Sequence, residues 1–187
     1  MTTAPSRPAE LLLGAAAAGA DSATLSLPAD FGAEKAAWAF VDATLVRWRR
    51  TALAPRVHTA AGELVANALE HGLSGPFAEP FPHPLVVAVL SEGPDVLCAV
   101  FDPGTGLPLK ATGHGLHVVD AVSDAWGWTV PGPWGKGVWA AISASGTGAG
   151  PAPHTVRRLL LLTEFLTGDE RPRLVTAGRE PTVPGLV

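Results

Sequence analysis

The chain has 187 residues, of which 47% are hydrophobic and 16% are charged, so it holds enough apolar material for one domain of ordinary size with an appendage. The formal net charge of −4 argues against a nucleic-acid-binding surface. Cys98 is the only cysteine, which excludes an intrachain disulfide and a cysteine-based zinc site and favours a reducing compartment.

Residues 1–22 are predicted to form a flexible tail rather than a targeting signal. Leu11–Ala20 is apolar and rich in small residues, like the central part of a signal peptide, but Glu10 directly precedes it and Arg7 is the only positive charge before it. No apolar run reaches the roughly 20 residues that span a bilayer. The sequence therefore predicts a cytoplasmic protein without a membrane segment.

Residues 23–145 carry the pattern of one domain, which begins with a strand and two helices. Thr24–Leu27 alternates polar and apolar residues, as an edge strand does. Residues 33–50 repeat apolar side chains at helical intervals and predict the first helix. Pro55 suits the first turn of a second helix, Ala54–His71.

The second half of this domain predicts a hairpin, a short helix and two further strands. The apolar runs are Leu85–Leu90 and Val96–Phe101, followed by a helix at Leu116–Val122 and strands near Trp126–Val130 and Gly137–Ser143. This order predicts an α/β (α+β) two-layer sandwich with a mixed, mainly antiparallel sheet and helices on one face.

Residues 146–187 are expected to form a linker, a short helix and a flexible tail. Gly146–Pro153 is rich in Gly, Ala and Pro. Residues 156–166 form an apolar helical segment that would cover the sheet or contact a partner or a second copy. The last twenty or so residues are rich in Pro and Gly and predict no regular structure.

Three polar side chains are spaced to lie along one line of the second helix. Glu63, Asn67 and His71 stand at i, i+4 and i+8. A separate apolar stripe would anchor this helix on the core and consists of Val57, Ala61, Leu64 and Ala68. An acid, an amide and an imidazole beside a buried face suit a hard cation and a proton acceptor. A solvated helix face without function is the alternative.

Two glycine-rich turns follow this helix. Asp102 ends an apolar strand and enters a turn with Gly104 and Gly106, and Gly113–Leu116 then opens a short helix. Glycines let the backbone approach a ligand closely, and a helix start offers unpaired N–H groups to phosphate. Each turn alone is common in loops, but their order behind the Glu–Asn–His helix is a specific combination.

In this order the motifs resemble those of the GHKL ATPase superfamily, which includes histidine kinases, type II topoisomerases and a heat-shock chaperone. Within it, the likeness is to the small anti-sigma regulatory factors with serine/threonine kinase-type ATP-binding domains, over roughly Thr24–Ser143. Glu63–His71 is similar to the N box of that family, Phe101–Gly106 to the first glycine box and Gly113–Leu116 to the second, and Gly135–Ala140 resembles the closing strand motif. The resemblance implies the histidine kinase-like (Bergerat) ATPase fold and a site for ATP or ADP with Mg²⁺.

The resemblance also implies a role for each motif. Asp102 would accept a hydrogen bond from the exocyclic amine of adenine, although an Asp here also caps a turn without any ligand. Asn67 would give its amide oxygen to Mg²⁺, and Glu63 would polarise an attacking serine hydroxyl or water. The remaining nucleotide contacts would come from His71, Gly104, Gly106, Gly113, His114, Gly115, Leu116 and Gly137. His71 is equally suited to a partner of the helix dipole.

Three features depart from the family pattern. Leu107–Thr112 leaves only six residues between the glycine boxes, where related regulators carry a longer lid over the phosphates. His114 stands where arginine is common, and Gly137 where a threonine hydroxyl is expected beside adenine. The neighbouring Lys136 is either an exposed lysine in a tight turn or a positive charge near the nucleotide.

The implied protein is an ATP-binding regulator that contacts a sigma factor, an antagonist protein or both, and not nucleic acid. It is either a serine/threonine kinase acting on the antagonist or a degenerate, non-catalytic module that sequesters a sigma factor, and the short lid favours the second. The sequence leaves homodimerisation open. An unrelated α/β domain with accidental glycine turns is the third alternative.

Overall fold

Seven strands form one sheet in the computed structural model, which describes residues 17–18, 22–30, 32–73, 85–108, 115–146 and 150–177. In chain order they are β1 (Ala17–Ala18), β2 (Ser22–Leu27), β3 (Leu85–Glu92), β4 (Asp95–Asp102), β5 (Ala125–Thr129), β6 (Lys136–Ile142) and β7 (Leu174–Thr176). Their spatial order is β1-β2-β3-β4-β6-β5-β7, and each neighbouring pair is antiparallel. The described sheet is thus antiparallel, rather than mixed as expected.

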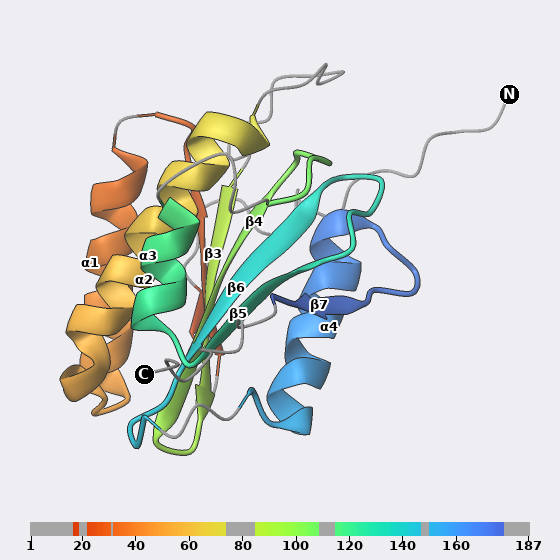
Figure 1. Ribbon diagram of the computed structural model, residues 1–187. Helices are drawn as coiled ribbons and strands as arrows, with labels where there is room; N and C mark the ends of the chain where they lie inside the picture. Colours follow the sequence, from red (N-terminus) through yellow and green to blue (C-terminus); the bar gives the residue numbers. More distant parts are fainter. Residues whose placement is uncertain are drawn as a thin grey trace, which may run out of the picture.

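Helices cover both faces of this sheet (Figure 1). They are α1 (Ala33–Arg47), the 3-10 turn η2 (Thr51–Leu53), α2 (Ala54–Asn67), the π-helical turn η3 (Ala68–Gly72), α3 (Gly115–Val122) and α4 (Pro153–Thr167). α1, α2 and α3 lie on one face, which confirms the expected α+β sandwich, and α4 adds a layer on the other face. None of the helices in these described ranges has the length and apolar character needed to cross a membrane.

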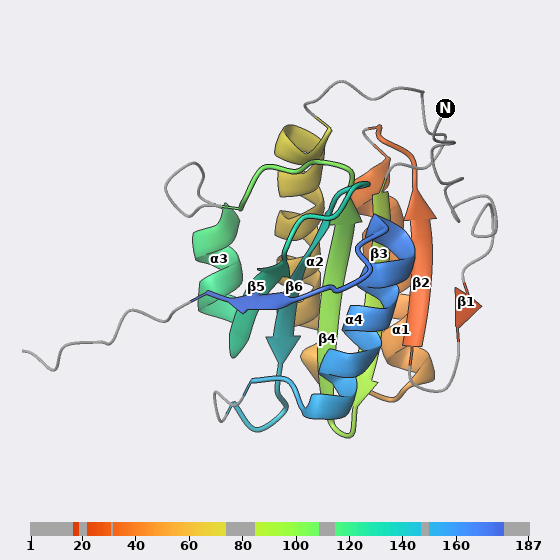
Figure 2. The same ribbon diagram turned by 90° about the vertical axis from the view of Figure 1, so that its right-hand side faces the viewer.

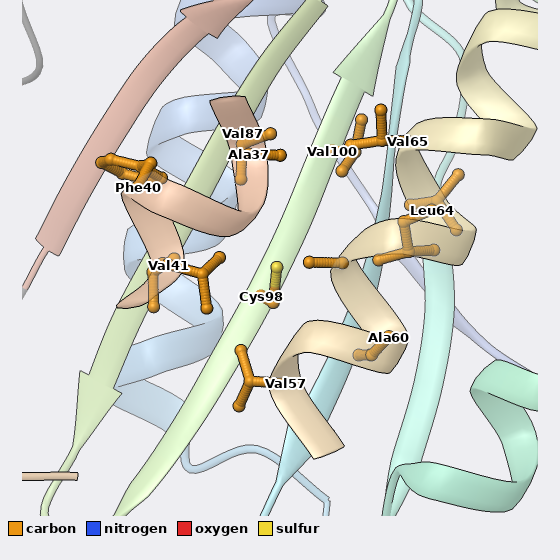
Figure 3. Packing of buried hydrophobic residues seen from close by; sticks show 14 of the residues in the cluster. Ala37, Phe40, Val41, Val57, Ala60, Leu64, Val65, Val87, Cys98 and Val100 are labelled. Carbon is orange, nitrogen blue, oxygen red and sulfur yellow. The ribbon is translucent and has the colours of Figure 1, made fainter. Parts of the chain in front are cut away.

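Alternate residues of the central strands build the core beneath α1, α2 and α3 (Figure 3). Successive side chains of a strand point to opposite faces, so Cys98 and Val100 of β4 face these helices whereas Phe101 faces α4. Because both faces are covered, β3 and β4 are continuous apolar runs. Burial raises the pKa of the Cys98 thiol to about 12, so this core thiol stays protonated and is unreactive.

α4 closes the second face of the sheet with a smaller cluster (Figure 2). Its Leu159 and Leu166 are buried together with Phe101 and Trp139 of the sheet. Gly168 follows the helix at φ 66, the left-handed conformation that favours glycine at a helix end. The apolar segment near the C-terminus therefore covers the sheet, one of the two roles that the sequence allowed.

β7 lies in a segment for which the sequence predicted no regular structure. It pairs with β5, where Trp128 stands opposite Val175. A three-residue strand carries no periodic signal of its own, so the neighbouring strand defines it. Gly127 permits the close approach, since a Cβ there would lie 1.9 Å from the carbonyl oxygen of Val175.

Candidate functional site

The helix with Glu63 and Asn67 is anchored as the sequence predicted. Its apolar stripe is buried in the core and consists of Val57, Ala61, Leu64 and Ala68. Glu63 and Asn67 are half-buried, and the Asn67 amide has no hydrogen-bond partner among the described residues. The two polar side chains are therefore held on a helix whose position the core fixes.

Arg56 fixes the start of α2, a role that no sequence signal indicated. Its Nε donates to the carbonyl oxygen of Val122 at 2.8 Å, and its two Nη groups donate to the Ser143 carbonyl and to Asp124 Oδ2, each at 2.9 Å. These bonds tie α2 to the end of α3 and to the residue after β6. The polar residues of α2 consequently hold a defined position relative to α3.

The second helix changes its hydrogen-bonding pattern after Asn67. The sequence predicted one α-helix to His71, whereas Ala68–Gly72 form a π-helical turn. A π turn bonds residue i to residue i+5 and is wider than an α turn, so the segment between Asn67 and His71 does not keep the α-helical spacing. The His71 side chain is 44% exposed and lies 3.8 Å from the Glu70 carboxylate. The predicted α-helical spacing therefore holds from Glu63 to Asn67, and a π-helical turn replaces it before His71.

Gly72, the last residue of the π turn, lies directly on the carboxylate of Asp102. A Cβ at Gly72 would lie 2.5 Å from Asp102 Oδ1, and a Cβ at Gly104 would lie 2.8 Å from the Gly72 backbone. The first glycine turn thus closes tightly against the end of the helix. Gly106 differs, because an added Cβ would meet nothing within 4 Å. Only Gly104 of the two turn glycines is required by this packing.

Asp102 and Lys136 form a buried ion pair that the sequence did not predict. The two residues stand opposite each other on β4 and β6. Lys136 Nζ lies 2.8 Å from Asp102 Oδ1 and also donates to the Gly104 carbonyl oxygen at 3.1 Å. The Lys136 and Asp102 side chains are 3% and 0% exposed. Lys136 is therefore not an exposed lysine in a turn. The one sequence feature that could have indicated its burial is its position directly before an apolar strand.

The two oxygens of the Asp102 carboxylate have different surroundings. Oδ1 accepts from Lys136 and from the Gly104 N–H at 2.8 Å, the turn-capping bond that such an Asp makes without a ligand. Oδ2 is buried and has no hydrogen-bond partner within the described ranges. Burial raises the pKa of Asp102, while Lys136 and the Gly104 N–H act against the rise. Because most buried polar atoms are hydrogen-bonded, Oδ2 requires a donor.

Gly137 faces away from Asp102, which corrects its assignment beside the base. It stands opposite Phe101, and a Cβ there would lie 2.7 Å from the Phe101 ring. Neighbouring positions on a strand point to opposite faces, so Lys136 and not Gly137 shares the face of Asp102. The Gly137 N–H donates to Thr129 Oγ1 at 2.8 Å. Its glycine is explained by packing on the α4 side of the sheet.

Glu63 lies against the start of α3. A Cβ on Gly115 would lie 2.7 Å from Glu63 Oε2, so the glycine leaves room for the carboxylate. The position is electrostatically favourable, since a helix start attracts negative charge. Leu116, another expected contact, is buried in the core with its side chain. Gly113 and His114 lie outside the described residues.

α2 and η3 connect these two places. Glu63 meets the start of α3, and Gly72, nine residues later, meets Asp102, a separation of roughly 13 Å along a helix. Asn67 lies between them in the chain. Across the described residues, no group of three or more His, Cys, Asp or Glu side chains is placed to hold a metal ion. The region offers a buried acceptor at one end and, at the other, a helix start beside an acid.

The fold defines the class of this protein as an α+β sandwich with an antiparallel sheet. No model of a protein family matches the sequence, and no curated protein matches it. The fold is similar to the crystal structure of the RsbU and RsbW domains of Rv1364c from Mycobacterium tuberculosis, with a TM-score of 0.51 and 22% sequence identity. The match covers 65% of this chain and 32% of that one, so the matched part of this chain spans about a third of the other's length. At this identity the similarity shows the fold alone.

Proposed function

We propose that this protein binds ATP and acts as a regulator of the anti-sigma factor type, through contact with a sigma factor or an antagonist protein. The observation that carries the proposal is Oδ2 of Asp102, a buried acceptor without a partner in the described chain, next to the end of the helix that bears Glu63 and Asn67. The order of the motifs supports it, as does the fold similarity to a structure that contains an RsbW domain.

Adenine would bind at Asp102. Its exocyclic amine donates a hydrogen bond, which Oδ2 lacks, whereas the carbonyl oxygen of guanine would be repelled by a carboxylate. Oδ2 is covered, and the Gly72 and Gly104 backbones lie close together beside the same carboxylate. Entry of a base therefore requires the backbone segments at Gly72 and Gly104 to move apart. The two glycines have no side chains that would obstruct a flat ring after that movement.

The phosphates would lie toward the start of α3. The first N–H groups of a helix and its dipole favour anions, and Gly115 allows close approach there. Asn67 would contribute its amide oxygen to Mg²⁺, which binds oxygen ligands and neutralises phosphate charge when present. This neutralisation is needed because Glu63 already places a negative charge at the same helix start.

The site supports two alternatives for the step after ATP binding. In the first, Glu63 accepts the proton of a serine hydroxyl of the antagonist, whose oxygen attacks the γ-phosphorus while ADP leaves. In the second, the protein holds its partner without turnover. Only six residues, 107–112, separate the two glycine turns, and so short a segment excludes water poorly from the phosphates. This feature favours the non-catalytic alternative.

Calorimetry with ATP in the presence and absence of Mg²⁺ tests the binding proposal. The natural protein is expected to bind ATP more tightly with Mg²⁺, and Asn67→Ala is expected to lose that difference. Thr59→Ala is the matched control, since Thr59 is exposed on the same helix and its hydroxyl donates to the Pro55 carbonyl oxygen of that helix. Equal heats from the natural protein and Asn67→Ala contradict the role of Asn67. No binding of ATP by the natural protein contradicts the whole proposal.

Labelled ATP and a candidate antagonist protein separate the two alternatives. Transfer of label that is lost in Glu63→Ala and kept in Glu164→Ala, an exposed acid on α4, establishes the kinase. ATP binding and retention of a sigma factor without any transfer establish the non-catalytic module. In either case the partner is expected to co-elute with this protein in gel filtration.

A further inference from the structure

We propose that Lys136 sets the base preference of this site, by holding Asp102 as an ionised acceptor for purines that carry an amine at position 6. The inference rests on the proposed function, because it concerns the same nucleotide. It adds a positioning residue that the motif resemblance does not supply.

The geometry makes Lys136 the partner of one carboxylate oxygen only. Its ammonium lies 2.8 Å from Oδ1 and 3.1 Å from the Gly104 carbonyl oxygen, and the Gly104 N–H reaches the same Oδ1. Asp102 is thus fixed through Oδ1, and Oδ2 remains as the acceptor. A pair that served only the fold would be expected to satisfy both oxygens, because an unpaired buried acceptor is costly.

Among the described residues, Lys136 is the charged group that acts on Asp102 from the elements packed around it. On η3, Glu70 and His71 are exposed and lie 3.8 Å from each other. On β3 and β4, Glu92 and Asp95 stand at the opposite end of the strands, where Asp95 accepts from the Ala144 N–H. Burial raises the pKa of Asp102, and Lys136 is the cation that opposes this. Without it, the carboxyl group is driven toward its neutral form.

The charge state of Asp102 decides which base it accepts. An ionised carboxylate can only accept, so Oδ2 pairs with the amine of adenine and repels the carbonyl oxygen of hypoxanthine. A neutral carboxyl group carries an O–H that donates to this carbonyl oxygen. ATP and ITP therefore serve as probes, because they differ at position 6 and in the proton on the neighbouring ring nitrogen. A site built around an acceptor discriminates strongly between such analogues.

The experiment measures the affinities of ATP and ITP between pH 6 and pH 8.5 in the natural protein, Lys136→Met and Lys35→Met. Lys35 is exposed on α1, so its variant loses the same charge away from the site. The natural protein and Lys35→Met are expected to prefer ATP at every pH. In Lys136→Met the preference for ATP is expected to fall at least about tenfold at pH 6 and to recover as pH rises and Asp102 ionises.

Lys136→Gln is a second variant in case Lys136→Met does not fold, because the Gln amide can still donate to Asp102 Oδ1 or to the Gly104 carbonyl oxygen without carrying a charge. Circular dichroism checks the fold of each variant, and Lys136→Gln is expected to show the same pH-dependent change of preference. An unchanged ATP-to-ITP ratio at all pH values overturns the role of Lys136 and leaves ATP binding intact. Loss of folding in both variants also overturns it, because it assigns Lys136 to the fold. If the natural protein binds neither nucleotide, the proposed function fails together with this inference.

Discussion

Removing the carboxylate of Asp102 tests the physical basis of the site. Asp102→Ala leaves the ammonium of Lys136, 3% exposed, without a counter-charge in the interior. Breaking a buried ion pair from one side costs about 3–5 kcal/mol, because the remaining charge stays buried and unpaired. Since a folded domain has only about 5–15 kcal/mol of total stability, the variant is expected to lose a large fraction of it.

The double variant Asp102→Ala/Lys136→Met removes both charges. Replacing a buried pair by apolar groups is often close to neutral, so the double variant is expected to be more stable than Asp102→Ala by at least about 1 kcal/mol. Urea unfolding of the natural protein, both single variants and the double variant gives the coupling energy. Lys35→Met, which removes an exposed lysine, is expected to stay within about 0.5 kcal/mol of the natural protein.

Lys136→Met is expected to change how the stability of the protein depends on pH. Without the lysine, burial raises the pKa of Asp102 in the folded state further above its ordinary value of 3.8. The folded protein then binds the proton more tightly than the unfolded chain. The contribution of Asp102 to the stability of Lys136→Met is therefore fully present below pH 3.8 and is lost as pH rises through the folded-state pKa. In the urea measurements, a coupling energy near zero, or a double variant as unstable as Asp102→Ala, would refute the idea that the buried charges of Asp102 and Lys136 stabilise each other.

Three further changes test the packing around the site. Gly137→Ala places a Cβ 2.7 Å from the Phe101 ring and is expected to lower the free energy of unfolding in urea by about 1–3 kcal/mol. Gly106→Ala has open space around it and is expected to be neutral or slightly stabilising. Equal losses of stability in the two variants contradict the placement of Gly137 against Phe101. Burial raises the pKa of the Cys98 thiol from 9.0 to about 12, so between these pH values only the unfolded chain releases the proton. This difference is expected to lower the stability by up to about 1.4 kcal/mol per pH unit between pH 9 and pH 12. Cys98→Ala should lack this component of the pH dependence. Arg56→Met loses three hydrogen bonds and is expected to weaken the contact between α2 and α3. Amide hydrogen exchange in α3 is then expected to become faster. An unchanged exchange rate argues against an anchoring role of Arg56.

Much of the fold was predictable because its signals are local. The apolar runs that became β3 and β4 were predicted with their ends within two residues, and all four residues of the predicted stripe on the second helix are buried. Helix and strand periodicity depends on neighbouring residues along the chain, which the sequence contains directly. The same local signals predicted a helix at residues 156–166 without deciding whether it covers the sheet.

The candidate site was predictable as a set of residues but not as a set of contacts. No local sequence signal indicates that Ala68–Gly72 form a π turn, in which Gly72 lies on Asp102. The pairing of Asp102 with Lys136 requires the exact register of β4 and β6, two strands separated by about thirty residues. A shift of one residue would have put Gly137 there instead, because side chains alternate between faces.

Composition, periodicity and the order of the polar and glycine motifs by themselves determined the α+β class, the helix with Glu63 and Asn67, and the strand that ends in Asp102. Only the tertiary structure decided that Lys136 forms an ion pair with this aspartate, that one of its oxygens is left without a donor among the described residues, and that Glu63 meets the start of α3. The physical reason is distance along the chain. Propensity acts between near neighbours, whereas burial and charge pairing depend on which distant segments the folded sheet brings together.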